Sequence, residues 1–122
     1  MNYLYVALGG AVGAAGRYLL SQIKLTESFP LTTMVINILG AIIIGAVSYL
    51  PTLWGSINPH LNIFLTVGLC GGFTTFSTFS LETVRLLESD RLAMALAYII
   101  CSVVLCIIGI YLGRGAVKLF LS

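Results

Sequence analysis

The chain has 122 residues, of which 59% are hydrophobic and 8% are charged, and its formal net charge is +2. A soluble domain carries about 25% charged residues, so this composition indicates a protein embedded in a membrane. The small net charge and the lack of a basic cluster exclude nucleic acid as a partner. The sequence also lacks a nucleotide-binding loop, a metal-ligand cluster and paired acids, so we expect no enzyme.

Four predicted membrane-spanning helices fill residues 1–122 as a single integral membrane domain. A spanning helix needs about 20 mostly apolar residues, and the expected helices cover about 3–23, 31–50, 61–86 and 92–116. We expect Pro51 to end the second helix, because proline lacks the N–H that the helical ladder requires. The three cysteines fall inside these spans without disulfide or metal spacing, and we expect them to be packing residues.

The third predicted helix contains an unusual stretch at residues 68–80, Gly-Leu-Cys-Gly-Gly-Phe-Thr-Thr-Phe-Ser-Thr-Phe-Ser. Irregular, polar backbone at membrane depth is tolerated only where protein or a wet cavity surrounds it. The stretch therefore predicts a helix that is broken near 71–75, halfway across the membrane. Carbonyl oxygens freed at such a break can coordinate a small cation, and two copies meeting there would form a buried Na⁺ site.

The polar side chains inside the spans favour an anion over a cation as the transported species. A cation pathway would show membrane-embedded acids, yet only Glu82 lies within a span. The other polar residues are neutral donors: Thr33, Asn37, Thr74, Thr75, Ser77, Thr78, Ser80, Tyr98 and Ser102. Their spacing places them in stripes on three helices, although a single Ser or Thr more often bonds to its own helix.

Several of these residues have two interpretations. Asn37 either joins two helices or donates to a passing ion, and Arg17 is either an anchor at the membrane surface or an attractor for anions. Glu82 either pairs with Arg85 or takes part in the polar track. The side chains of Phe76 and Phe79 share a helix face, either as packing or with their positive ring edges turned toward an anion.

The positive charges do not specify the orientation. Both termini lie on one side of the membrane, with Arg114 and Lys118, while Lys24, Arg85 and Arg91 lie on the other. Lysine and arginine are thus nearly balanced between the two sides. Either other features decide the orientation, or the chain inserts both ways and assembles as an antiparallel pair.

Three motifs in the sequence resemble the Fluc fluoride channels, also called the CrcB family. They are Gly-Gly-Ala-Val-Gly-Ala-Ala-Gly-Arg-Tyr at 9–18, Asn-Ile-Leu-Gly at 37–40 and the stretch at 68–82 that ends in Ser-Leu-Glu. The resemblance covers the entire chain. It implies an antiparallel, dual-topology homodimer in the cell inner membrane that exports fluoride passively and so lowers its concentration in the cytoplasm.

The resemblance also implies roles for individual residues. A structural Na⁺ at the dimer centre would be held by the backbone carbonyls of Gly71 and Thr74 from both subunits. Arg17 would lie in the vestibule. The ion pathway would include Asn37, Phe76, Phe79, Thr33, Thr75, Thr78, Ser77, Glu82, Tyr98 and Ser102.

Two other classes of membrane protein compete with this interpretation. A small multidrug-resistance exporter is also a short four-helix antiparallel dimer, but it needs a glutamate in its first span, and residues 1–16 contain no acid. An accessory membrane subunit without transport activity would have no need of a hydroxyl-rich break. The sequence alone does not exclude such a subunit. The resemblance predicts a passive fluoride channel whose partners are fluoride, a second copy of the chain and membrane lipid.

Overall fold

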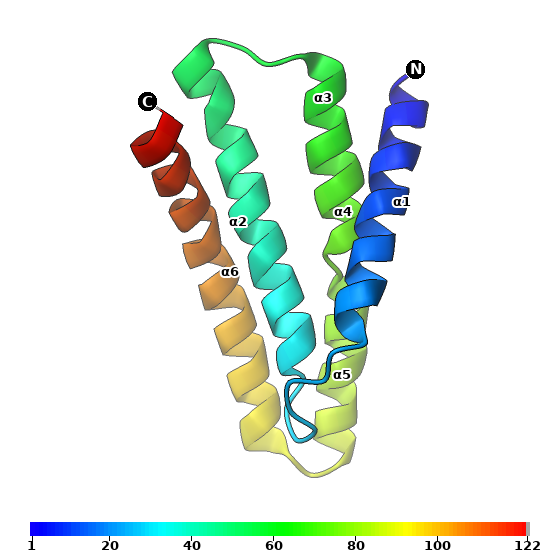
Figure 1. The fold of residues 1–122 in the computed structure, drawn as a ribbon. Helices are drawn as coiled ribbons and strands as arrows, with labels where there is room; N and C mark the ends of the chain where they lie inside the picture. The colour runs from blue at the N-terminus through cyan, green and yellow to red at the C-terminus, as the bar shows by residue number, and fades with distance from the viewer. Residues whose placement is uncertain (122) are drawn as a thin grey trace.

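All regular structure in the computed structural model, which describes residues 1–121, is helical. The elements are α1 (Asn2–Ser21), α2 (Leu31–Trp54), α3 (Pro59–Ile63), the π-helix η1 (Phe64–Cys70), α4 (Gly71–Phe73), α5 (Phe76–Glu88) and α6 (Leu92–Leu121). The consecutive elements from Pro59 to Glu88 (α3, η1, α4 and α5) lie end to end, and we refer to them as the third column. This column, α1, α2 and α6 are the four long helical segments of the chain (Figure 1). The prediction of an all-α membrane protein is confirmed.

Three of the four segments are long and apolar enough to cross a membrane: α2, the column Pro59–Glu88, and α6. The first segment, α1, has 20 residues but is not among them. Its glycines and Arg17 lower its hydropathy, and the same glycines let it lie directly against the third column (Figure 1).

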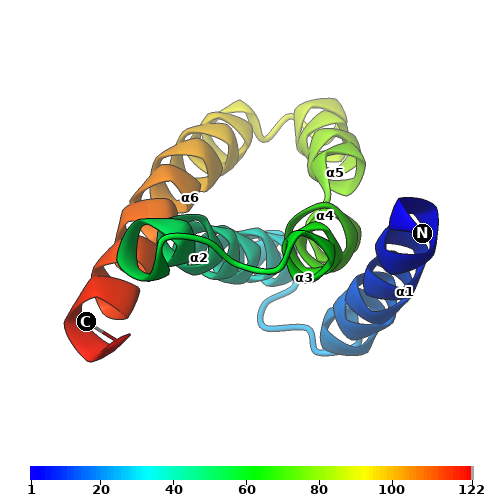
Figure 2. The same cartoon turned by 90° about the horizontal axis from the view of Figure 1, so that it is seen from above.

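Glycines permit two close helix contacts. A Cβ atom added at Gly9 would lie 2.9 Å from Cα of Gly68, so α1 and η1 approach backbone to backbone. A Cβ added at Gly113 would run into the backbone of α2, because α6 and α2 pack equally tightly there. Small residues at such contacts are typical of membrane helices. Seen from above, the α2–α6 pair lies at one side, α1 at the other, and the third column between them (Figure 2).

The prediction that Pro51 ends the second helix is wrong, because α2 continues through it to Trp54. Pro51 removes one donor from the ladder, but it lies in the last turn, where few bonds depend on it. The π-helical winding of η1 was not predicted either. It coincides with the contact between Gly9 and Gly68, where the two backbones almost touch.

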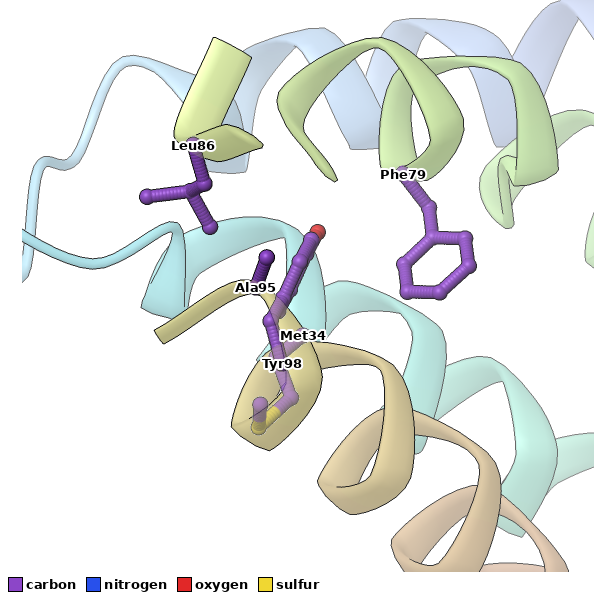
Figure 3. Packing of buried hydrophobic residues seen from close by; sticks show 5 residues of the cluster. All are labelled: Met34, Phe79, Leu86, Ala95 and Tyr98. Atoms are coloured by element: carbon purple, nitrogen blue, oxygen red, sulfur yellow. The ribbon is translucent and has the colours of Figure 1, made fainter. Parts of the chain in front are cut away.

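The buried core is small and lies between α2, α5 and α6. It consists of Met34, Phe79, Leu86, Ala95 and Tyr98, and Figure 3 shows the side chains from α5 pointing toward those from α6. Tyr98 is fully buried. Most of the remaining apolar surface of α6 is exposed, as expected for a helix that faces lipid or another protein.

Candidate functional site

The third column is interrupted between α4 and α5. Helix α4 ends at Phe73 and α5 begins at Phe76, while Thr74 (ψ 159°) and Thr75 (φ −149°) have extended backbone. The hydroxyl of Thr75 accepts a hydrogen bond from the Thr78 N–H at 3.1 Å and so caps the start of α5. Such a side-chain cap satisfies one of the donors that a helix start leaves free. We refer to Thr74–Thr75 as the interruption.

Asn37 of α2 supports the interruption from one side. Its Nδ2 donates to the Thr75 carbonyl at 3.1 Å, and its Oδ1 accepts from the Thr75 N–H at 2.8 Å. The side-chain amide thus satisfies both backbone groups of a residue that has left the helical ladder. This pairing explains how a mid-helix Asn is tolerated at this depth.

Arg17 of α1 supports the interruption from another side. Its Nε donates to the Gly72 carbonyl at 3.2 Å. The resemblance implies that Arg17 lies in a vestibule, and this remains a prediction. In the structure its side chain reaches the end of α4. It does not line the polar cavity described below.

The hydrogen bonds made by Asn37 and by the Thr75 hydroxyl leave two backbone carbonyls without their helical donors. In a continuous helix the carbonyls of Gly71 and Thr74 would accept from the N–H groups of Thr75 and Thr78. Here the Thr75 N–H donates to Asn37, and the Thr78 N–H donates to the Thr75 hydroxyl. The two released carbonyls are those that the resemblance implies as sodium ligands. Unwound backbone carbonyls are suitable ligands for Na⁺, so the donor set fits this ion.

A cavity of about 390 Å³ lies beside the interruption, between α2, the third column and α6. Its wall includes Asn37, Thr75 and Ser102 as polar residues, together with Phe76 and Phe79. The two phenylalanine rings are in contact, with centroids 5.5 Å apart. Phe79 is buried, whereas Phe76 is 78% exposed in the single protomer.

A hydrogen-bonded cluster surrounds Glu82. The Tyr98 hydroxyl donates to Oε1 at 2.8 Å, and the Thr33 hydroxyl donates to Oε2 at 3.1 Å. The Tyr98 ring also packs against Phe79, with centroids 5.0 Å apart. The cluster therefore joins side chains of α2, α5 and α6 next to the phenylalanine pair.

A second, polar cavity of about 720 Å³ opens at the end of the bundle away from the termini. Its wall includes Thr33, Thr78 and Glu82, and also Lys24 and Arg85. Tyr98 lies between the two cavities, since it contacts Glu82 on one side and Phe79 on the other.

Two of the residues predicted for the ion pathway, Ser102 and Ser77, do not belong to the hydrogen-bonded cluster around Glu82. Ser102 is buried in the wall of the first cavity, and within residues 1–121 its hydroxyl has no hydrogen-bond partner. Ser77 is exposed, and its hydroxyl lies 3.4 Å from the Thr75 hydroxyl. The structure thus gathers most of the predicted residues around two adjoining cavities and leaves Ser77 on the outer surface of one protomer.

Some wall residues were not singled out from the sequence as part of the site. The first cavity is also lined by Thr66, Cys70 and Cys106. Cys106 follows Ser102 by four residues, so helical spacing from Tyr98 and Ser102 was a usable signal for it. Thr66 and Cys70 carried no such signal, because their orientation depends on the π-helical winding of η1.

Comparison with known proteins shows the family of the chain. Residues 4–114 match the model of the family described as CrcB-like protein, Camphor Resistance (CrcB). A protein of Ruminiclostridium cellulolyticum named fluoride-specific ion channel FluC is 44% identical over 100% of this chain and 96% of its own length. A protein of the same name from Phocaeicola vulgatus is 49% identical over 92% of this chain and 94% of its own length. This family consists of ion channels and not of enzymes, and the chain belongs to it.

Proposed function

We propose that this protein is a fluoride channel that lets the ion leave the cytoplasm passively across the cell inner membrane. The observation that carries the proposal is the interruption with its cavity, where neutral donors and two phenylalanines meet. Relatives that the chain matches over nearly its whole length are named fluoride-specific ion channels. Neutral donors can replace the water around a small anion without adding a repelling negative charge.

The functional unit of this proposal is an antiparallel homodimer formed by chains inserted in both orientations. One protomer leaves Phe76 78% exposed beside a cavity whose wall is mostly apolar and carries a few polar groups, among them Asn37 and Thr75. A partner subunit would cover this ring and the cavity together. The balance of positive charge between the two sides of the membrane supports insertion in both orientations.

A sodium ion at the dimer centre is the second part of the proposal. The carbonyls of Gly71 and Thr74 lose their helical donors to Asn37 and Thr75. The same carbonyls from the partner subunit would complete the ligand set. The bound ion would supply positive charge between two carbonyl-rich helix ends and so join the subunits.

The ion would pass between the two cavities by stepwise transfer. The polar cavity presents Thr33, Thr78 and Glu82, and the cavity beside the interruption presents Thr75, Ser102 and the phenylalanine edges. Tyr98 lies between the two groups. Glu82 takes part as the acceptor that orients two hydroxyls. Ser77 would join the path only where the dimer brings its surface against the partner.

Two other functions are less well supported. A proton-coupled multidrug exporter would need an acid in the first helix, and the only charged side chain of α1 is Arg17. An accessory subunit without transport would not need the donors around Thr75.

Ion efflux from liposomes that contain the purified protein tests the proposal. We expect rapid fluoride efflux with little chloride efflux, and equal rates for both anions would refute fluoride selectivity. Phe76→Ile should suppress efflux, whereas Phe120→Ile is the matched control, because both rings are 78% exposed. Replacing Na⁺ by a large organic cation throughout purification should dissociate or inactivate the dimer, and unchanged activity would remove sodium from the proposal.

A further inference from the structure

Arg17 carries the only charged side chain of α1, and it lies within the helix rather than at its end. A charged group at membrane depth is costly unless it has a partner. The partner is specific, because Nε donates to the carbonyl of Gly72, 55 residues away in the sequence, at 3.2 Å. The guanidinium is partly buried in this position.

Close packing of α1 against α4 brings Arg17 to this carbonyl. A Cβ atom added at Gly13 would lie 2.8 Å from the Phe73 nitrogen, and one added at Gly72 would lie 2.6 Å from the Gly10 carbonyl. Both positions therefore require glycine. Arg17 follows Gly13 by one helical turn, so the close approach sets its side chain at the last residues of α4.

The hydrogen bond between Arg17 and the Gly72 carbonyl is electrostatically favourable. The end of a helix exposes carbonyls that have no helical donor and carries a partial negative charge. In a continuous helix the Gly72 carbonyl would accept from the N–H of Phe76, but α4 ends at Phe73. Arg17, whose guanidinium is always charged, supplies the donor instead.

We propose that Arg17 is a positioning residue that holds the α4 end of the interruption from the α1 side. Asn37 holds the Thr75 end from the α2 side. By occupying the Gly72 carbonyl, Arg17 fixes the chain between the two carbonyls of Gly71 and Thr74. The inference rests on the proposed function only in taking the interruption as part of the fluoride path.

This role differs from the two that the sequence suggested for Arg17. An attractor for anions would raise the local fluoride concentration, so its loss would be compensated by more fluoride. An anchor at the membrane surface would need no particular backbone partner. A positioning residue instead changes the stability of the interruption itself.

Hydrogen exchange of the backbone amides of Thr74, Thr75 and Thr78 measures that stability without any ion flux. These amides donate to Cys70, Asn37 and the Thr75 hydroxyl. Arg17→Met removes the charge and the donor at similar length, and we expect their exchange to accelerate by about tenfold or more, as for a lost charged hydrogen bond. Arg17→Lys should restore part of the protection.

Arg114→Met is the matched control, because Arg114 Nε also makes an interhelical hydrogen bond, to Ser48 at 3.3 Å. We expect wild-type exchange at the interruption in this variant. In liposomes, Arg17→Met should lower the maximal fluoride efflux without changing the half-saturating fluoride concentration.

Unchanged exchange in Arg17→Met would overturn the inference, as would a raised half-saturating concentration at a normal maximal rate. If Arg17→Met does not fold, exchange in Arg17→Lys decides, because lysine keeps a charged donor but lacks the guanidinium Nε. Protection below that of the wild type would support the inference, and wild-type protection would overturn the requirement for the Nε contact with Gly72. If the wild-type protein does not conduct fluoride, the proposed function fails, while the exchange measurement still tests Arg17.

Discussion

The side chain of Asn37 provides the sharpest test of how the interruption is held. Replacement by leucine keeps nearly the same volume but removes both the donor and the acceptor that Thr75 uses. The Thr75 N–H and carbonyl then have no partner in α2. At membrane depth these backbone groups would have to find new partners, such as water in the cavity, or return to the helical ladder.

The size of the effect follows from the two bonds, which measure 3.1 and 2.8 Å. A net hydrogen bond contributes about 1 kcal/mol, and interhelical bonds in membranes average somewhat less. Losing both should therefore destabilise the interrupted conformation by about 2 kcal/mol. This corresponds to roughly a thirtyfold change in its equilibrium. Fluoride efflux should fall by up to this factor, because only the fraction of protein in the interrupted conformation would place Phe76 and Thr75 at the cavity.

The assay compares Asn37→Leu with Ser48→Ala in liposomes and by thermal denaturation. Ser48 lies on the same helix and also makes two hydrogen bonds, to the Gly45 carbonyl and from Arg114, but far from the interruption. We expect strong loss of fluoride efflux in Asn37→Leu alone. Equal efflux in the two variants would refute the reasoning and would leave Asn37 as an ordinary contact between helices.

Two further predictions concern packing and the Glu82 cluster. Gly113→Ala should destabilise the protein by about 1 to 3 kcal/mol, since its new methyl group would meet the backbone of α2. Gly115→Ala is the control and should stabilise slightly, because nothing lies within 4 Å of its added Cβ and alanine favours the helix. Thermal denaturation in detergent distinguishes the two variants, and equal melting would contradict the contact. Tyr98→Phe keeps the ring but removes the donor to Glu82. We expect about fivefold slower fluoride efflux from the loss of about 1 kcal/mol, with Tyr111→Phe on the exposed face as control, and wild-type efflux would exclude the hydroxyl from the path.

The sequence was sufficient to predict four helical segments and some of the residues around the two cavities. Glycine and hydroxyl residues inside an apolar run are informative because lipid makes unsatisfied backbone costly. Helical spacing likewise placed Thr33, Glu82 and Tyr98 on faces that can meet, and the structure joins them by hydrogen bonds. These inferences depend on local rules that act within one helix.

The partners of Asn37 and Arg17 could not be predicted in the same way. Asn37 binds a residue 38 positions away, and Arg17 binds a carbonyl 55 positions away. Both contacts depend on how closely the helices approach, which glycines permit but do not specify. Local rules also predicted the end of α2 wrongly, because they place a helix end at a proline. Here Pro51 lies within the last turn, and the helix continues to Trp54.

The interruption is therefore a property of the assembled protomer rather than of its own segment. Within the third column, residues Gly71–Thr75 have the option of completing the helical ladder, which lipid favours. Leaving the ladder becomes favourable only when α2 supplies an amide to Thr75 and α1 supplies a guanidinium to Gly72. Because those donors occupy some backbone groups and leave the carbonyls of Gly71 and Thr74 without helical partners, the packing of the first two helices would determine which carbonyls are free for the sodium ion proposed above.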